Sequence, residues 1–188
     1  MRRIIVSTLV TLDNVIEDPA GFGGSPHGGW AAPYFTDEEA RTSLDHLSGC
    51  DYFLCGRHTY ELFAKTWPGA SGPYADRLNA MPKLVASRTL TGDLTWNATL
   101  LDGDVVADLR RITHQPGGDI MMYGCPTLLR TLVQNGLVDE VNLLVCPVVV
   151  GGGRRLFDDG APGMRLELVA QNRNAAGAVS LRYRPVAQ

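Results

Sequence analysis

The chain has 188 residues, of which 45% are hydrophobic and 20% charged, and its formal net charge is −3 at pH 7. This length suffices for one domain with its own core, and the composition excludes a disordered chain as the default. Scattered basic residues on an acidic chain argue against nucleic acid as a partner. No apolar run approaches the ~18 residues of a membrane-spanning helix, so no membrane is expected either.

The first segment, MRRIIVSTLVTLDN, resembles a signal peptide only superficially. Ser7, Thr8 and Thr11 interrupt its apolar part, and it lacks a small-residue cleavage site. The segment therefore predicts a β-strand over 3–12 and a cytoplasmic protein.

Strand-like and helix-like segments then alternate along the chain. Thr36 followed by acidic residues predicts a helix over 36–48. Further helices are expected at 58–66, 103–113 and 126–135, and further strands at 51–55, 82–87, 96–101, 119–123 and 138–150. Residues 165–185 read as a hairpin. The alternation predicts a single α/β domain over 1–188, with a mostly parallel sheet, helices on both faces and antiparallel edge strands at the C-terminus.

The four cysteines form no C-x-x-C pair, and the four histidines are dispersed. Two cysteines, Cys55 and Cys146, lie in apolar runs. Buried, reduced thiols are therefore expected, and no metal site.

Residues 13–35, rich in glycine and with three prolines, fit no regular element. Loops this long are uncommon in a compact domain and tend to be lids or binding loops. Trp30 and Tyr34 favour substrate binding, because an aromatic wall suits a planar ligand. Anchoring of the loop to the core, or a plain surface excursion, are the alternatives.

The stretch LCGRHTYELF, residues 54–63, places Gly56, Arg57 and Thr59 between a buried strand and a helix. Free N–H groups at a helix start attract anions, and the guanidinium fork suits phosphate. A plain strand-to-helix turn is the alternative reading of this stretch alone.

Two more strand ends repeat the arrangement. Ser87 and Arg88 follow one strand, and residues 124–127 (Gly-Cys-Pro-Thr) open another helix. Ligands of open α/β sheets bind beyond the carboxyl ends of the strands. Neither the Rossmann nor the P-loop fingerprint is present, so a nucleotide cofactor on a different scaffold is indicated.

Three stretches together closely resemble the dihydrofolate reductase-like superfamily: LCGRHTYELF, PKLVASR and DIMMYGCPTLLRTLVQNGLVDEVNLLVCPVVVGGGRRLF. The nearest likeness is to stand-alone proteins related to the reductase domain of the bifunctional riboflavin-biosynthesis deaminase-reductase. The resemblance covers nearly the whole chain in order and implies a three-layer α/β fold. The zinc signature of the deaminase is absent.

The resemblance also implies NADPH as the cofactor. Arg57 and Thr59 would contact its phosphates, and Ser87 and Arg88 would lie at the adenosine end, where an arginine favours NADPH over NADH. Residues 124–127 would cradle the pyrophosphate, and the Tyr123–Gly124 bond falls where the family has a cis peptide. The implied cofactor-binding set is Leu9, Ile16, Gly56, Arg57, Thr59, Ser87, Arg88, Tyr123, Gly124, Cys125, Pro126 and Thr127.

Within this set, Leu9 and Ile16 would frame the nicotinamide. Core packing is the alternative for these two residues.

The substrate side departs from the family. Dihydrofolate reductases carry an acidic residue on the first helix, and the equivalent position here is Ala40. Glu39, next to this position, is the catalytic candidate, with helix capping and a solvated charge as the alternative. The glycine that normally follows the aspartate of the first loop is also missing after Asp13. VVVGGG at 148–153 could form a backbone nest for a substrate phosphate, or simply a tight turn.

These patterns predict an NADPH-dependent reductase that passes a hydride to a small planar heterocycle or carbonyl compound. The alternatives are 5-amino-6-(5-phosphoribosylamino)uracil reductase or dihydrofolate reductase activity, and an NADP(H)-binding protein without turnover.

A homodimer is also expected. The apolar strand VNLLVCPVVV and the terminal hairpin place an edge where a symmetric copy could pair, as the family does. The alternative is a hairpin whose apolar face is wholly internal.

Overall fold

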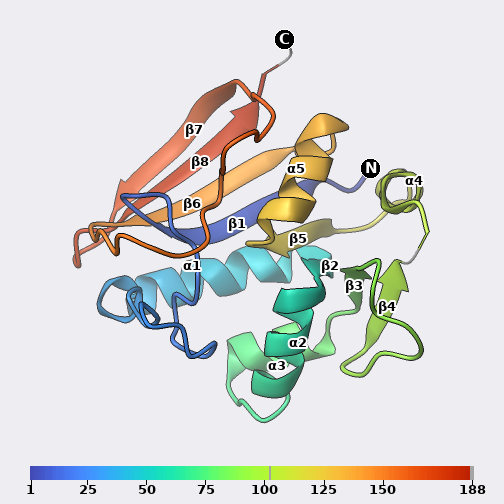
Figure 1. Cartoon of the computed structure of the whole chain (residues 1–188), viewed down its shortest axis with the longest axis horizontal. Coiled ribbons are helices and arrows are strands. Elements are labelled where there is room, and N and C mark those ends of the chain that lie inside the picture. Colours follow the sequence, from blue (N-terminus) through green and yellow to red (C-terminus); the bar gives the residue numbers. More distant parts are fainter. Residues whose placement is uncertain (102, 187–188) are drawn as a thin grey trace.

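The N-terminal apolar run forms β1 (Ile4–Thr11), an inner strand of an eight-stranded sheet (Figure 1). The computed structural model describes residues 1–101 and 103–186. β1 runs parallel to β5 (Asp119–Tyr123) on one side and to β6 (Glu140–Cys146) on the other. Ile4, Ile5 and Val6 are all buried, as a strand covered on both faces requires.

The strand order is β4-β3-β2-β5-β1-β6-β8-β7. The remaining strands are β2 (Cys50–Gly56), β3 (Lys83–Ala86), β4 (Ala98–Leu101), β7 (Leu166–Arg173) and β8 (Val179–Pro185). β8 is antiparallel to β6 and β7 is antiparallel to β8, whereas every other pair is parallel. The predicted sheet with its C-terminal antiparallel hairpin is therefore confirmed.

The strand predicted over 138–150 is too long. β6 ends at Cys146 because Pro147 has no N–H to extend the ladder, and the Val148 amide instead donates back to the Cys146 carbonyl over 2.8 Å.

Helices cover both faces of the sheet. α4 (Val105–Thr113) and α5 (Pro126–Gln134) lie above the strands in Figure 1, and α1 (Asp37–Ser48), α2 (Arg57–Thr66) and α3 (Pro73–Ala80) lie below them. Thr36 caps α1 as expected, accepting from the Glu39 amide over 3.4 Å. α3 was not predicted, although Pro73 at its first turn is a recognised start signal.

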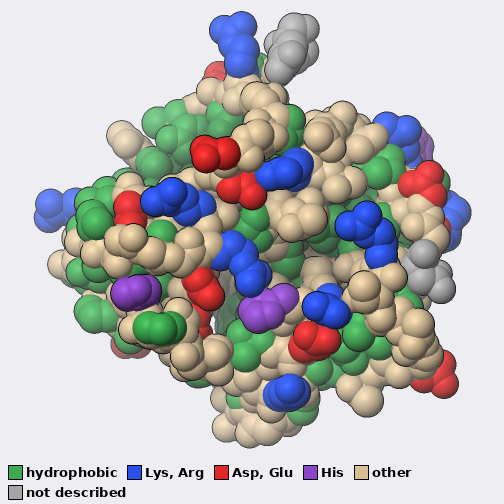
Figure 2. Space-filling model, in the orientation of Figure 1, with side chains coloured by type: hydrophobic (Ala, Val, Ile, Leu, Met, Phe, Trp, Pro, Cys, Tyr) green, Lys and Arg blue, Asp and Glu red, His purple; other side chains and the backbone are tan. Residues whose placement is uncertain are grey.

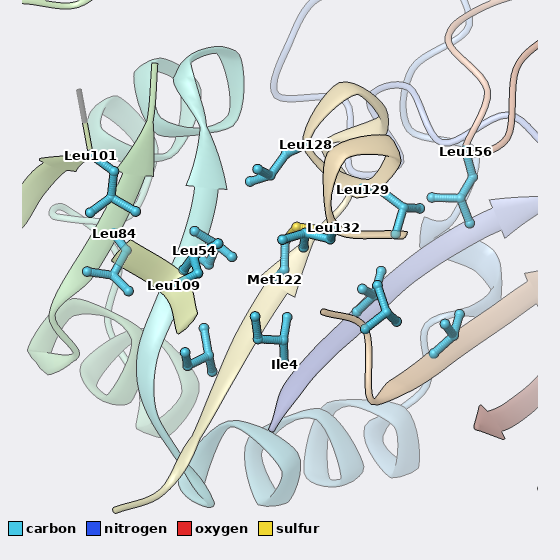
Figure 3. Close-up of a cluster of buried hydrophobic side chains, with 14 of the residues drawn as sticks. Ile4, Leu54, Leu84, Leu101, Leu109, Met122, Leu128, Leu129, Leu132 and Leu156 are labelled. Carbon is cyan, nitrogen blue, oxygen red and sulfur yellow. The ribbon is translucent and has the colours of Figure 1, made fainter. Parts of the chain in front are cut away.

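Each face has its own core. Leucines of α4 and α5 pack with Ile4, Leu54 and Met122 of the sheet (Figure 3). On the opposite face, Phe53 and Met121 pack against α1, α2 and α3.

All four cysteines are free, and Cys125 alone of them is only half-buried. Free thiols are therefore observed as expected, and the expected burial is confirmed for Cys50, Cys55 and Cys146 but not for Cys125. In the described part of the chain, no helix combines the length and apolar character needed to cross a membrane.

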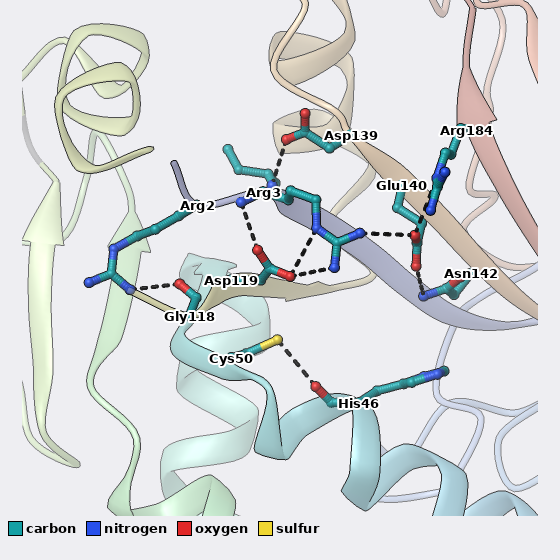
Figure 4. A network of polar contacts seen from close by, with 11 residues as sticks. Arg2, Arg3, His46, Cys50, Gly118, Asp119, Asp139, Glu140, Asn142 and Arg184 are labelled. Carbon is teal, nitrogen blue, oxygen red and sulfur yellow. Dashed lines mark hydrogen bonds and ion pairs between the residues drawn. The ribbon is translucent and has the colours of Figure 1, made fainter. Parts of the chain in front are cut away.

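At the amino ends of the strands, arginine and carboxylate side chains form ion pairs and hydrogen bonds with one another (Figure 4). Arg3 donates to the Asp119 carboxylate and lies 3.4 Å from that of Glu140. Arg2 pairs with Asp51 and donates to the Gly118 carbonyl over 2.6 Å. This network ties β1 to β2, β5 and β6 at the end of the sheet remote from the predicted site.

Candidate active site

Two helix starts meet at the carboxyl ends of β2 and β5. Gly124 and Cys125 adopt φ values of +59° and +57°, and this left-handed turn leads directly into α5. Cys125 Sγ accepts from the Gly56 amide over 3.1 Å and lies 3.2 Å from Thr59 Oγ1. The turn therefore joins the start of α2 to that of α5, and both starts present backbone N–H groups suited to an anion.

The Tyr123–Gly124 bond is not cis, which corrects the expectation drawn from the family. The described residues contain no cis peptide, and two successive left-handed residues make the turn with trans bonds. Burial raises the pKa of the Cys125 thiol, so its sulfur stays a neutral hydrogen-bonding group.

A smaller cavity of about 480 Å³ lies beyond β3, with Ser87 and Arg88 in its lining. Ser87 Oγ accepts from the amides of Thr89 and Leu90 over 3.1 and 3.0 Å, so this hydroxyl shapes the turn. Arg57 reaches the same turn, donating to Thr89 Oγ1 over 3.1 Å. The start of α2 therefore contacts both the turn beside this cavity and the turn at Cys125.

The main cavity is about 960 Å³ and extends from the Gly124 turn, between α1 and the sheet, to β7 and β8. Figure 2 shows a hollow in the surface with acidic, basic and histidine side chains around it. A volume of this size accommodates a cofactor's reactive end together with a small substrate.

Aromatic side chains form much of one wall. Phe63 and Trp67 lie with ring centroids 6.0 Å apart, and Tyr74 lies 5.4 Å from Trp67. Tyr123, at the end of β5, packs edge-on to Phe53 at 5.2 Å and accepts a 2.8 Å hydrogen bond from the Tyr74 hydroxyl.

Glu39 forms part of the opposite wall. Its side chain is buried, with 6% of the residue exposed, so the alternative of a solvated charge is wrong. Its carboxylate accepts from Asn174 over 3.2 Å and from Ser180 over 3.4 Å. The C-terminal hairpin thus holds this carboxylate beside the cavity.

The loop 13–35 has one short 3-10 turn, Ala32–Tyr34, and its Asp18 carboxylate accepts from the amides of Gly23 and Ser25. Trp30 is buried against Leu144 and Cys146, and its indole donates to the Glu17 carbonyl over 2.9 Å. Trp30 and Tyr34 therefore have packing contacts and lie outside the cavity lining. Phe35, the third aromatic residue of this loop that favours a binding role, does line the cavity, as does Phe22.

The glycine-rich turn at 148–153 is occupied by the protein itself. The Asp13 carboxylate accepts from the Gly151 amide over 2.8 Å and from the Val150 amide over 3.3 Å. The hydrogen bond from the Thr11 hydroxyl, assisted by these two amide bonds, holds the pKa of Asp13 below its usual value. A substrate phosphate would have to displace this carboxylate, so the nest expected there is not free.

Most of the predicted cofactor residues come together. The main cavity is lined by Leu9, Ile16, Thr59, Tyr123, Gly124, Cys125 and Pro126, and the smaller one by Ser87 and Arg88. The other three are not in either lining but lie at the helix starts: Gly56 and Arg57 begin α2, and Thr127 is in the first turn of α5. Ile16 also packs in the hydrophobic core, so the alternative of core packing is observed for this residue as well.

Sequence reasoning missed Tyr74, Trp67 and the hairpin residues of the lining, 170–172 and 180–182. Nothing local marks them as site residues, because the fold brings them in from distant segments. Within residues 1–101 and 103–186, no three His, Cys, Asp or Glu side chains gather as a metal site.

Comparison with known proteins agrees with this geometry. The family model of the RibD C-terminal domain matches residues 2–179. The Bacillus subtilis (strain 168) protein YyaP is 29% identical over 187 residues, covering 97% of this chain and 94% of that one.

Two solved structures share the fold. A pyrimidine reductase-like protein from Corynebacterium diphtheriae has a TM-score of 0.69 at 14% identity, over 100% of this chain and 93% of its own. Dihydrofolate reductase from Enterococcus faecalis, complexed with NADP(H), has a TM-score of 0.64 at 11% identity, over 98% of this chain and 97% of its own. The chain therefore belongs to the RibD C-terminal domain family and has the dihydrofolate reductase-like fold.

Proposed function

We propose that this protein is an NADPH-dependent reductase that transfers a hydride to a small planar heterocycle or carbonyl compound. The observation that carries the proposal is the turn at Gly124 and Cys125, which joins two helix starts between the two cavities. NADPH would supply the hydride, and the chain would supply orientation and exclusion of water.

The nucleotide fits the residues present. The N–H groups at the starts of α2 and α5 suit the pyrophosphate, and Arg57 and Arg88 lie on the side where an adenosine 2′-phosphate would be. Within the described chain Arg88 forms no ion pair and is exposed, so its guanidinium is available to a phosphate. Leu9 and Ile16 in the main cavity offer an apolar seat for the nicotinamide.

Two alternatives remain as proposals. Membership of the RibD C-terminal domain family, together with the fold shared with dihydrofolate reductase, supports 5-amino-6-(5-phosphoribosylamino)uracil reductase or dihydrofolate reductase activity as the specific reaction. Ala40 at the position of the usual acid instead favours an NADP(H)-binding protein without turnover.

Two measurements test the proposal. Calorimetric titration should show that NADPH binds more tightly than NADH, and equal affinities would contradict it. Oxidation of NADPH, followed with a pterin, a riboflavin precursor and a quinone in turn, should then separate an enzyme from a binding protein.

We also propose a homodimer in the cytoplasm. β7 is an edge strand on which Leu168 and Val169 are 46% and 37% exposed, and a symmetric copy could cover its unpaired backbone groups. Free cysteines suit a reducing compartment. Light scattering that gives a mass near 20.4 kDa, the mass of one chain, would refute the dimer.

A further inference from the structure

The pair of hydroxyl groups on Tyr74 and Tyr123 has one proton more than its own hydrogen bond uses. Tyr74 donates to Tyr123 over 2.8 Å, so the Tyr123 proton needs a different acceptor. Among residues 1–101 and 103–186, no protein group accepts it. Both residues are half-buried on the wall of the main cavity, so this proton is available to a ligand there that offers an acceptor.

The pair lies where a ligand would reach it. Tyr123 is the last residue of β5, directly before Gly124, and it is the cross-strand partner of Ser7 on β1. Tyr74, Tyr123, Ser7 and Gly124 all line the main cavity. The unused proton therefore lies beside the turn expected to hold the cofactor.

The surroundings keep both groups as donors. Phe53 and Trp67 pack against the two rings and make this wall apolar. Burial raises the pKa of Tyr74 to about 12 and that of Tyr123 well above its ordinary value, so both phenols stay protonated at neutral pH. A hydrogen bond from such a donor is stronger in an apolar wall than in water.

We infer that Tyr123 binds and polarises the hydride-accepting end of the substrate, donating a hydrogen bond to a carbonyl oxygen or an imine nitrogen of a planar ring. Such a bond withdraws electrons from the carbon that receives the hydride. Tyr74 is a positioning residue that orients the Tyr123 hydroxyl. The role in reduction rests on the proposed function, whereas the donor site itself does not.

Glu39 does not compete for this role. Its carboxylate oxygens already accept from Asn174 and Ser180. The cavity thus has a hydrogen-bond donor on the aromatic wall and a carboxylate on the opposite wall.

The test uses 1-indanone, a planar ketone, and indane, the same ring system without oxygen. Affinities are measured on the full chain with and without NADP⁺, and the carbonyl stretch of bound indanone is recorded by infrared spectroscopy. Tyr123→Phe keeps the ring that packs against Phe53 and removes only the hydroxyl. Its preference for indanone over indane should fall about tenfold relative to wild type, and the carbonyl stretch should move to higher wavenumber.

Two further variants locate the donor. Tyr74→Phe leaves the Tyr123 hydroxyl in place, so the preference should fall only about twofold to threefold. Tyr52→Phe, whose ring lies 5.1 Å from Arg2 and outside the cavity lining, should change neither readout.

An unchanged preference and stretch in Tyr123→Phe would overturn the inference. So would a wild type that fails to bind indanone at its solubility limit, or a larger loss in Tyr74→Phe than in Tyr123→Phe. If the nucleotide does not bind but the indanone preference still depends on Tyr123, the proposed function fails and the donor site stands.

Discussion

The two ends of the parallel strands use the same kinds of side chain in different ways. At the amino ends, Arg3 bonds to the Asp119 carboxylate and Arg2 bonds to Asp51 and two carbonyls (Figure 4). At the carboxyl ends, in the described part of the chain, neither Arg88 nor Arg154 forms an ion pair. Arginines with satisfied donors stabilise the fold, whereas arginines with free donors at the mouths of cavities are available to an anionic ligand.

Removing Arg88 should have the largest effect on binding. A charge-assisted bond to a 2′-phosphate contributes ~1.5–3 kcal/mol, so Arg88→Ala should weaken NADPH binding roughly 10-fold to 100-fold and leave NADH binding unchanged. Calorimetric titration of both nucleotides measures this.

Arg3→Ala is the matched control from the other end of the sheet and should not change the ratio of the two affinities. If Arg57→Ala narrows the gap between NADPH and NADH and Arg88→Ala does not, the phosphate roles of the two arginines are reversed.

Removing Arg2 should lower stability instead. Its side chain is 9% exposed, and its loss removes the donor to two carbonyls and leaves the Asp51 carboxylate with the Gly118 amide as its remaining donor. Because Asp51 is 46% exposed, the expected loss in Arg2→Ala is only about 1.5 kcal/mol at pH 7, measured by urea unfolding.

The pH dependence sharpens this prediction. The hydrogen bond from Arg2 lowers the pKa of Asp51 in the folded protein. The stability that it contributes is therefore present above the unfolded pKa of about 3.9 and is lost as the pH falls through the folded value. The difference between Arg2→Ala and wild type should shrink in acid, and a constant difference would contradict the account.

Lys83 is a cation that the fold buries completely. Its ammonium donates to the Asn79 carbonyl over 2.8 Å and lies 4.1 Å from the centroid of the Trp96 ring, yet burial lowers its pKa to about 8. Lys83→Met should stabilise the protein by about 1 kcal/mol at pH 7, since these contacts offset only part of the desolvation.

The increase in stability of Lys83→Met over wild type should be greatest below about pH 8, the pKa of Lys83 in the folded protein. It should disappear as the pH rises beyond 10.5, the ordinary lysine pKa, because wild-type Lys83 is then neutral in both the folded and the unfolded protein. Lys65→Met, on the exposed part of α2, is the matched control and should have almost no effect on stability. A destabilised Lys83→Met would mean that the contacts to Asn79 and Trp96 outweigh the cost of burial.

The smallest expected effect concerns the loop. Phe22 lies 52% exposed at the cavity, with its ring centroid 6.5 Å from that of Trp67, so the loop approaches the aromatic wall through Phe22. Hydrogen exchange in residues 20–32 should slow when NADPH and substrate bind together. Residues 105–113, on the opposite face of the sheet, serve as the control. Unchanged exchange in residues 20–32 would mean that this segment is a surface loop that does not close over the ligands.

The fold and the cofactor side could be predicted because their signals are local. Gly56 to Thr59 and Gly124 to Thr127 are contiguous strand-to-helix junctions, so each is recognisable within four consecutive residues, although the bonds from Cys125 to Gly56 and Thr59 that join them form only in the fold. Alternating strands and helices likewise specify a parallel sheet before any contact is known.

The substrate side could not be predicted in this way. Glu39 is buried by Asn174 and Ser180, which lie more than 130 residues later in the chain. Tyr74 meets Tyr123 across 49 positions from a helix that was not foreseen. Asp13 fills the glycine-rich turn at 148–153 through long-range bonds of the same kind.

A crystal structure of the protein with NADPH would show where each part of the cofactor binds. We expect the pyrophosphate at the Gly124–Cys125 turn, the 2′-phosphate at Arg88, and the nicotinamide beside Leu9 and Ile16 with one face open to the main cavity. A nucleotide bound elsewhere, or no nucleotide at saturating concentration, would contradict this expectation.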